Sequence, residues 1–422
     1  MPVQHIYVEN FKSFSRLDLG LSGFHVVIGS NAAGKSNFIS IFRFLRDIAQ
    51  SGIINAIAMQ GGTEYLQNTQ IGPSRDLRIK VEYVPDQNAE VCNSQGKDDI
   101  SQLSLHSLIS SYEFAIRFDP RGNDFVITKD TLTIGFEVTA GECNGLLHGQ
   151  KSKGGRGEIT VTNEGGELIY SVNLPKDCPI SEKEIIPGNF CIKRLPEKTL
   201  LLETPYAYSL PHLEKFFDRI AVYDIDPKLL KKGLTITGKR DLDEDAGNLA
   251  VVLKNITGDS EKKRKFLNLL RDILPFVEDF SVEKFMDISL VLTLRERYAR
   301  NRVFPAPSLS DGTMTIFALI IAIYFEDKPF VIFEEPVTHI HPFLVARVIA
   351  MLKEGSKNRQ VLVTTHSTEV VKHVKIEDLL LISRDTEGFS VVSRPADKRE
   401  VRTFLENEIG IEELYVQNLL GL

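Results

Sequence analysis

One chemical pattern is divided between the two ends of this chain. A glycine-rich run, Gly29–Ser36, lies within the first forty residues and directly follows the β-branched run Phe24–Ile28. The acidic residues that such a run needs as partners, Glu334 and Glu335, come only after residue 329. A site built from both must bring the ends of the chain together in space. The residues between them must therefore be an insertion.

The glycine-rich run has the context of a phosphate-binding loop. Apolar residues repeat at helical spacing after it, which predicts a helix that opens at Gly34–Ser36. Backbone amides and the helix N-terminus would attract phosphates, Lys35 would reach the β- and γ-phosphates of ATP, and Ser36 would hold Mg²⁺. The predicted nucleotide-binding residues are Gly29, Ser30, Asn31, Ala32, Ala33, Gly34, Lys35, Ser36 and Asn37.

The acidic pair stands at the end of a second expected strand. Phe330–Phe333 is apolar throughout, which is typical of a strand buried on both faces. Its C-terminal end, where ligands of open α/β sheets bind, carries Glu334 and Glu335. By position Glu334 would assist Mg²⁺, and Glu335 would polarise the attacking water. Aspartate is usual at the first place, so contact of the longer Glu334 through water is an alternative to direct coordination.

Two further histidine positions invite interpretation. Gln360–Thr365 predicts another strand, and His366 at its end would hydrogen-bond the γ-phosphate and sense its loss. Lys35, Glu335 and His366 are therefore the predicted catalytic residues. His339 and His341 look like a metal pair, but Pro342 after them favours a role in shaping the turn into the next helix.

A second anion-binding helix start is predicted near the acidic pair. Leu309–Thr313 precedes the apolar run Ile316–Ile323, so Ser310 and Gly312 stand where a helix would begin. Because one ATP has one γ-phosphate, this second site invites a second ATP. Taken alone, the segment is also compatible with a simple helix cap.

The order of these motifs resembles that of ABC-type ATPase heads of the SMC/RecF group. The shared order is Asn10–Phe14 on an N-terminal strand, the phosphate loop, Leu309–Thr313, the acidic pair with a downstream His-Pro, and Thr364–Ser367. In that family two heads clamp two ATP molecules. The resemblance implies that Ser310, Asp311 and Gly312 act in trans on the ATP of the other subunit. It also implies that Lys12 lies near the nucleotide. The family has a glutamine that contacts magnesium and water; Gln60 and Gln67 flank residues 61–66, and neither is assigned to that place.

The resemblance also implies the architecture. We expect an α/β P-loop NTPase fold, an ABC-type ATPase head with an inserted antiparallel β region and a helical lobe. The head would comprise residues 1–80 and 285–422, the β-rich insertion 81–205, and the helical lobe 206–284. Size and layout are similar to those of small single-head ATPases of bacterial anti-phage defence modules of the overcoming-lysogenization-defect, Septu and PARIS type. No long heptad run predicts the coiled-coil arms of SMC proteins.

Patterns in the insertion are weaker. Short strands are expected at 77–83, 112–118, 124–127, 131–136 and 159–162, with a turn at 121–123. The glycine- and lysine-rich segment 139–157 would be an exposed hairpin tip or a phosphate-backbone contact. A helix is expected from a Ser260 cap to Leu274. The basic residues 262–265 would form a solvated face or a nucleic-acid contact, and Arg295, Arg297, Arg300 and Arg302 would line a dimer interface, contact nucleotide or bind DNA.

Composition narrows the setting. The net charge of −7 argues against wholesale coating of nucleic acid or anionic membrane. The four cysteines show no CxxC spacing, which favours reduced thiols in a cytoplasmic protein. The apolar stretch Ile316–Phe325 is about half as long as a helix that crosses a bilayer, so no membrane partner is expected.

These features predict an ATP-hydrolysing switch that dimerises around ATP. It would act on a separate effector protein of nuclease or Toprim-like type, on DNA, or on both, in anti-phage defence. The alternative is a RecF-like ATPase of DNA repair. In a transporter ATPase, the phosphate loop and the segment that corresponds to Leu309–Thr313 would lie much closer in sequence. A P-loop kinase would explain neither Ser310 nor His366.

Overall fold

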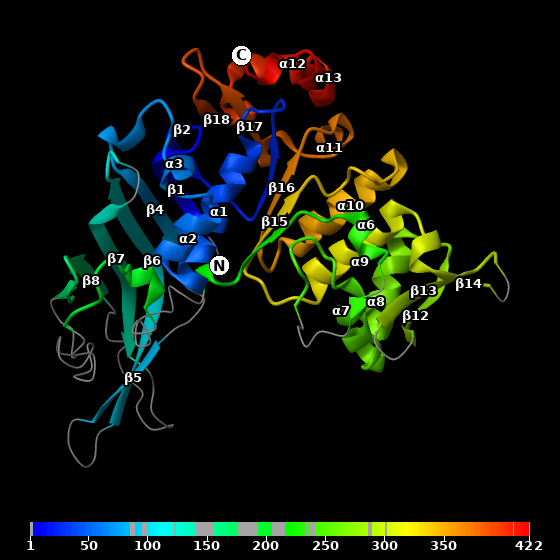
Figure 1. Cartoon of the computed structure of the whole chain (residues 1–422), viewed down its shortest axis with the longest axis horizontal. Helices are drawn as coiled ribbons and strands as arrows, with labels where there is room; N and C mark the ends of the chain where they lie inside the picture. The colour runs from blue at the N-terminus through cyan, green and yellow to red at the C-terminus, as the bar shows by residue number, and fades with distance from the viewer. Residues whose placement is uncertain are drawn as a thin grey trace. The chain divides into compact units, whose positions relative to one another are not determined.

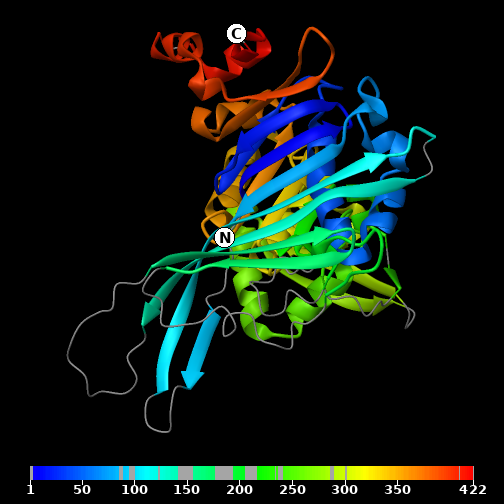
Figure 2. The ribbon, with the colours of Figure 1, turned by 90° about the vertical axis from the view of Figure 1, so that its left-hand side faces the viewer.

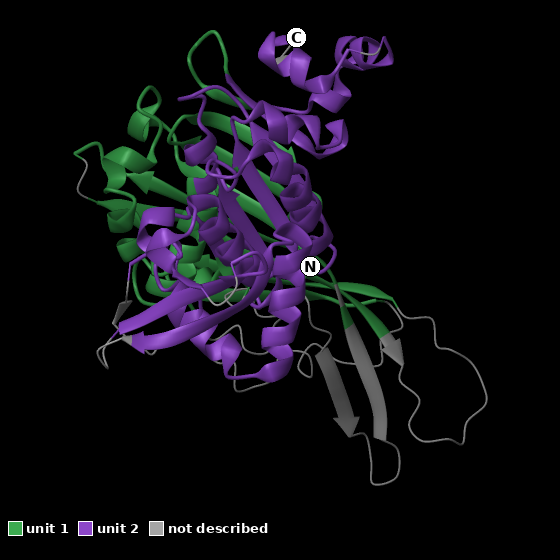
Figure 3. Ribbon diagram, turned by 90° about the vertical axis from the view of Figure 1, so that its right-hand side faces the viewer, with its two compact units in different colours: residues 1–22, 40–220, 384–391 green, residues 23–39, 221–383, 392–422 purple. Residues whose placement is uncertain are grey.

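The chain divides into two compact units that exchange segments along the sequence. The computed structural model describes residues 3–84, 89–94, 100–121, 124–140, 155–175, 193–204, 216–232, 234–235, 241–285, 289–299, 302–407 and 409–421. Unit 1 contains residues Met1–Ser22, Ser40–Ile220 and Arg384–Val391, and unit 2 contains Gly23–Ile39, Ala221–Ser383 and Val392–Leu422 (Figure 3). Each unit therefore draws on both ends of the chain.

Unit 1 is built on an antiparallel sheet with the order β2-β1-β4-β6-β7-β8-β9, and β5 pairs with β6 beside this path. Its strands are β1 (Val3–Phe11), β2 (Phe14–Gly20), β4 (Leu77–Tyr83), β5 (Ala89–Ser94), β6 (Ile100–Phe118), β7 (Phe125–Ala140), β8 (Arg156–Glu164) and β9 (Glu167–Asn173). Figure 2 shows the long β6 in cyan. Alternate residues of β4 are buried, as a sheet with one packed face requires. Helices α2 (Ile53–Met59) and α3 (Thr63–Leu66) also belong to this unit.

Two sequence-based expectations for unit 1 need correction. The segments 124–127 and 131–136 are not separate strands, because β7 runs through both of them. Asn10–Phe14 does not lie on one strand either: it forms the tight turn between β1 and β2, where Phe11 pairs with Phe14. Residues 122–123 and most of the glycine- and lysine-rich segment, 141–154, lie outside the described residues.

Unit 2 contains the central sheet, in the order β10-β15-β16-β3-β17-β18. Its strands are β3 (Phe24–Ile28), β10 (Ile220–Tyr223), β15 (Phe330–Glu334), β16 (Gln360–Thr365), β17 (Leu379–Arg384) and β18 (Ser390–Ser393). The pairs β15·β16, β16·β3 and β17·β3 are parallel. This sheet confirms the α/β P-loop fold class expected from the three apolar runs. It also places the carboxyl ends of β3, β15 and β16 at one edge.

Helices and a smaller sheet complete unit 2. The helices are α1 (Lys35–Ser51, which begins in this unit), α6 (Pro227–Leu230), α7 (Leu249–Thr257), α8 (Ser260–Ile273), α9 (Asp311–Tyr324), α10 (Pro342–Gly355), α11 (Thr368–Lys372), α12 (Arg399–Glu406) and α13 (Ile411–Val416) (Figure 1). The smaller sheet has the order β11-β13-β12, with β14 paired to β13. Its strands are β11 (Leu234–Thr235), β12 (Val277–Phe285), β13 (Ser289–Glu296) and β14 (Val303–Pro305).

Helices α9 and α8 show how the local sequence determines the burial and the start of a helix. Every residue of α9 from Thr313 to Ile323 is buried, so its continuous apolar run is the centre of the unit 2 core. Helix α8 is capped by Asp259, whose carboxylate accepts from the amides of Glu261 and Lys262; the expected cap Ser260 is already inside the helix. Within the described residues, no helix combines the length and apolar character that a membrane span requires.

Candidate active site

The phosphate loop connects β3 to α1 within unit 2. Strand β3 is buried along its whole length, and α1 begins at Lys35, as the sequence predicts. Gly34 has a φ of 119°, a backbone conformation that residues with a side chain rarely adopt. The Lys35 ammonium donates to the carbonyl oxygens of Gly29 at 2.7 Å and Ser30 at 3.2 Å. Burial lowers the pKa of Lys35, and the charges of Glu335 and Glu334 oppose this effect.

Ser36 and Glu334 meet although almost the whole chain separates them. The Ser36 hydroxyl donates to Oε1 of Glu334 at 2.7 Å. Parallel pairing of β15 with β16, and of β16 with β3, carries both residues to the same edge of the sheet. A hydroxyl and a carboxylate are oxygen ligands of the kind that Mg²⁺ prefers. The pair therefore fits the magnesium site expected from the sequence.

Glu335 is oriented by the residues at the end of β16. Its Oε1 lies 2.7 Å from Nδ1 of His366, and its Oε2 accepts from the Thr365 hydroxyl at 3.1 Å and the His366 amide at 3.3 Å. About a quarter of the Glu335 side chain is exposed, against more than half of the His366 side chain. The carboxylate is thus held in place while the imidazole faces solvent. The sequence pattern predicted no role for Thr365, although Thr365 is one of the two residues that hydrogen-bond the Glu335 carboxylate.

The Ser310 segment forms the expected helix start. Ser310 is the N-cap of α9, and its hydroxyl accepts from the amide of Thr313 at 3.1 Å. Asp311 forms an ion pair with Lys231 at 2.5 Å, and this contact lowers the pKa of the Asp311 carboxyl. Ser310 is exposed, whereas the rest of the helix enters the core. Ser310 therefore lies at the surface of unit 2, with its hydroxyl bonded to the amide and the hydroxyl of Thr313.

One residue of this site carries no sequence motif. Tyr415 lies on α13 and is half-buried. Burial raises the pKa of Tyr415, and the nearby Glu335 charge adds to the increase. A single tyrosine in a short helix close to the end of the chain gives no signal of this burial. Only the folded chain reveals it.

Lys12 and the two candidate glutamines lie in unit 1. The Lys12 ammonium donates to Oε1 of Gln60 at 2.8 Å, and burial, followed by the charge of Arg43, lowers the pKa of Lys12. The side-chain oxygen of Gln67 is buried and has no hydrogen-bond partner within the described part of the chain. The side-chain oxygen of Gln60 is therefore hydrogen-bonded to Lys12, whereas the buried side-chain oxygen of Gln67 has no hydrogen-bond donor among the described residues.

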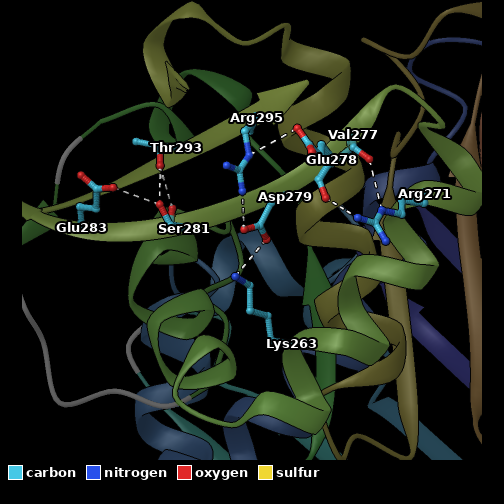
Figure 4. A network of polar contacts seen from close by, with 9 residues as sticks. All are labelled: Lys263, Arg271, Val277, Glu278, Asp279, Ser281, Glu283, Thr293 and Arg295. Atoms are coloured by element: carbon cyan, nitrogen blue, oxygen red, sulfur yellow. Dashed lines mark hydrogen bonds and ion pairs between the residues drawn. The ribbon is translucent and has the colours of Figure 1, made fainter. Parts of the chain in front are cut away.

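Arg295 belongs to an ion network on β12 and β13. Its guanidinium lies 3.2 Å from Asp279 and 3.5 Å from Glu278, and Lys263 of α8 reaches Asp279 at 2.9 Å (Figure 4). Lys263 and Arg295 therefore neutralise carboxylates of their own unit. Arg297 and Arg302 are exposed, and Arg300 lies outside the described residues.

The two histidines after the acidic pair have a structural setting. His341 is the N-cap of α10 and accepts through Nδ1 from the amide of Phe343 at 3.2 Å, so it shapes the helix start as expected. Among the residues that the structure describes, no group of three or more His, Cys, Asp or Glu side chains is placed to hold a metal ion.

Two family models match separate parts of the chain. Residues 1–132, with the phosphate loop, match a model described as "AAA ATPase domain". Residues 223–372, with Ser310, the acidic pair and His366, match one described as "AAA domain, putative AbiEii toxin, Type IV TA system". No curated protein matches the sequence.

Three solved structures are similar to the chain at low identity. An SmcHead bound to the C-winged helix domain of ScpA shows 16% identity over 93% of this chain and 96% of its own, with a TM-score of 0.47. The SMC head domain from Thermotoga maritima shows 14% over 93% and 99%, with a TM-score of 0.41. The Smc head domain with an extended coiled coil, bound to the C-terminal domain of ScpA derived from Pyrococcus furiosus, shows 14% over 96% and 100%, with a TM-score of 0.45.

The two AAA models divide the site as the sequence does, with the phosphate loop in one and the acidic strand in the other. The fold reunites both parts in unit 2 through the contact of Ser36 with Glu334. The chain is a P-loop ATP hydrolase, two separate parts of which match AAA models.

Proposed function

We propose that this ATPase is a switch that dimerises around ATP and controls a separate effector protein or a DNA contact in anti-phage defence. The observation that carries the proposal is the meeting of Ser36, Glu334, Glu335 and His366 at one sheet edge. Such a site binds a triphosphate and positions water, but it offers no group that would damage a second molecule. The output therefore belongs to a partner.

The residues suggest a division of labour in hydrolysis. Ser36 and Glu334 would hold Mg²⁺, which would neutralise phosphate charge when bound. Thr365 and His366 aim the Glu335 carboxylate, which would take a proton from the attacking water. Because Nδ1 of His366 is engaged by Glu335, Nε2 remains to contact the γ-phosphate. Loss of that phosphate would then change the contacts of His366, and through His366 those of Glu335.

Ser310 supports the dimeric part of the proposal. It is exposed at the start of a 14-residue helix, so its hydroxyl and the helix N-terminus can approach an anion outside unit 2. In a dimer that anion would be the γ-phosphate bound by the partner's loop. The description of the second AAA model names a toxin of a toxin–antitoxin system, which supports a defence setting with a separate effector.

Glu335→Gln tests the catalytic assignment. The amide keeps the shape of the side chain but cannot accept a proton, so we expect ATP binding to persist while kcat falls at least about 100-fold. ATP should then hold the variant as a dimer during size-exclusion chromatography.

A matched control lies on α11, where Glu369 contacts His373 at 3.0 Å. Glu369→Gln makes the same chemical change at a second Glu–His pair and should leave kcat within about twofold. Wild-type turnover in Glu335→Gln would contradict the assignment of the base.

A further inference from the structure

The start of α9 combines an exposed hydroxyl with a carboxylate. Ser310 caps the helix, and Asp311 is its first residue. The Asp311 side chain is 39% exposed, so its charge lies at the same surface as the Ser310 hydroxyl. A carboxylate at this place stabilises the helix, because it faces the positive end of the helix dipole. The same charge repels any anion that approaches Ser310 from outside unit 2.

One cation is packed against this carboxylate. Lys231 follows α6 as its C-cap, and its ammonium lies 2.5 Å from Oδ1 of Asp311. Helix α6 packs against α9 (Figure 1), and Pro227 and Leu230 of α6 are buried. Only 23% of the Lys231 side chain is exposed. The packing of α6 therefore holds the ammonium next to Asp311.

The first turn of α9 is fixed, so the carboxylate stays beside Ser310. The Ser310 hydroxyl is bonded to the amide and the hydroxyl of Thr313. Gly312 lies so close to the His339 carbonyl oxygen that a Cβ there would approach it to 2.6 Å. The ion pair also lowers the pKa of Asp311, which keeps the carboxylate ionised. Its repulsion of an anion is consequently offset by a neighbouring cation and not by protonation.

We propose that Lys231 is a positioning residue of the second anion site, where it neutralises Asp311 so that the γ-phosphate held by another subunit's loop can approach Ser310. Lys231 acts through Asp311 and does not itself contact the phosphate. The inference rests on the proposed dimerisation around ATP. Its consequence is that α6, in a segment that carries no motif, sets how tightly two subunits close on ATP.

Lys231→Met tests this inference, because it removes the charge and keeps a long apolar stem. The measurement is the dissociation constant of the dimer formed with a non-hydrolysable ATP analogue, determined by sedimentation. We expect this constant to rise about 10-fold, since an uncompensated charge then faces the phosphate. Binding of the analogue to a single subunit should stay within about twofold of wild type. Lys231→Arg keeps the charge and should restore the dimer to within about threefold.

A double-mutant cycle shows whether Lys231 acts through Asp311. In the Asp311→Asn background no carboxylate is left to neutralise, so Lys231→Met should change the dimer constant by less than about twofold. Lys328 provides the matched control, because it pairs with Asp241 at 2.6 Å, is 20% exposed and follows the opposite end of α9. Lys328→Met and Lys231→Met should both lower Tm by the small amount of one ion pair, but Lys328→Met should dimerise like wild type.

The outcomes separate this inference from the function on which it rests. A weaker dimer of Lys231→Met that is seen only with Asp311 in place supports it. Wild-type dimers of Lys231→Met would overturn it, and so would equal weakening in both backgrounds, because Lys231 would then act without Asp311. Failure of Lys231→Arg to restore the dimer would also overturn it. If the wild type itself forms no dimer with the analogue, the proposed dimerisation is wrong, and the inference with it.

Discussion

Glu335 has a backbone φ of 46°, in the left-handed region that residues with side chains seldom occupy. Such a conformation costs roughly 1–3 kcal/mol and persists only when neighbouring contacts hold it. Here the Glu335 amide donates to the carbonyl of Thr364, and the carboxylate is bound by Thr365 and His366. The strain lies at the residue proposed to activate water, where a fixed orientation has catalytic value.

A second residue with unusual chemistry, Asp130, is fully buried in unit 1. Its Oδ2 accepts from the Asn163 amide at 2.9 Å and the Leu201 amide at 2.8 Å, and its Oδ1 lies 3.0 Å from the Tyr112 hydroxyl. Burial raises the pKa of Asp130 to about 7. The Asn163, Leu201 and Tyr112 groups all donate to Asp130, so they oppose the increase in pKa that burial causes without cancelling it.

The Asp130 shift predicts a pH-dependent stability. Because the folded pKa lies above the unfolded value of 3.8, the folded state binds the proton more tightly. The resulting stabilisation is complete below the unfolded pKa and is lost as the pH rises through about 7. It amounts to at most about 4 kcal/mol. We therefore expect Tm to fall between pH 5 and pH 8, as measured by thermal denaturation.

Asp130→Asn isolates this contribution. The amide cannot titrate, so Tm should depend less on pH. Its oxygen can keep the Asn163 and Leu201 donors, but its NH₂ group replaces the acceptor of the Tyr112 hydroxyl, so Tm should be lower overall. Glu203, whose pKa burial also raises, stays in both proteins and retains its part of the slope. Equal pH slopes in the two proteins would show that Asp130 does not titrate in this range.

Among the elements, α9 connects the unit 2 core to Ser310, the exposed residue of the proposed second anion site. Its apolar body is buried, and its first turn is held by the Ser310 cap. A Cβ at Gly312 would approach the His339 carbonyl oxygen to 2.6 Å, closer than packing allows. Glycine is therefore required because the helix start passes directly over the chain that follows the acidic pair. This close packing fixes where Ser310 is presented.

Ser310→Arg should disrupt dimerisation and spare the single site. The large cation at an exposed helix start would exclude a partner's loop, while Gly29–Ser36 is unchanged. For the wild type we expect the ATPase rate to rise more steeply than linearly with protein concentration, since the proposed active unit is a dimer. Ser310→Arg should lose this steepness and its ATP-dependent dimer, but should still bind ATP.

Ser260→Arg provides the control, because it places the same side chain at the exposed start of α8. It should retain both the steep concentration dependence and the dimer. Persistent ATP-dependent dimers of Ser310→Arg would argue against action of this segment in trans.

At the scale of the whole molecule, the proposed switch must pass the nucleotide state to a partner. Lys35→Ala removes the ammonium that would bind the phosphates and should leave the chain unable to close on ATP. Glu335→Gln should hold the closed form. If the product of the neighbouring gene is the effector, its activity should differ between complexes with these two variants.

The measurement is the effector's own activity after co-purification with each variant. Equal activity with wild type, Lys35→Ala and Glu335→Gln would contradict control by head closure. Differential activity would identify the state that releases the effector.

The sequence alone determined those elements whose defining residues are adjacent in the chain. The strand, glycine-rich turn and helix around Lys35 lie within one short stretch, and β3, β15 and β16 form where their apolar runs predict them. Ser310 caps α9 for the same reason: the cap and the apolar run are adjacent in the chain. The motif order also led to the ATPase class before any contact was known.

Tertiary structure decided the features whose partners are distant in sequence. The polar run Thr128–Asp130 reads as a break between strands, yet β7 continues because Thr128, Lys129 and Asp130 find partners in Asp76, Glu113 and Asn163. Thr365 meets the Glu335 carboxylate only because β16 lies beside β15. A short sequence pattern gives the identity of a residue. The role of a polar side chain depends on the residue that it contacts, and only the fold determines that contact.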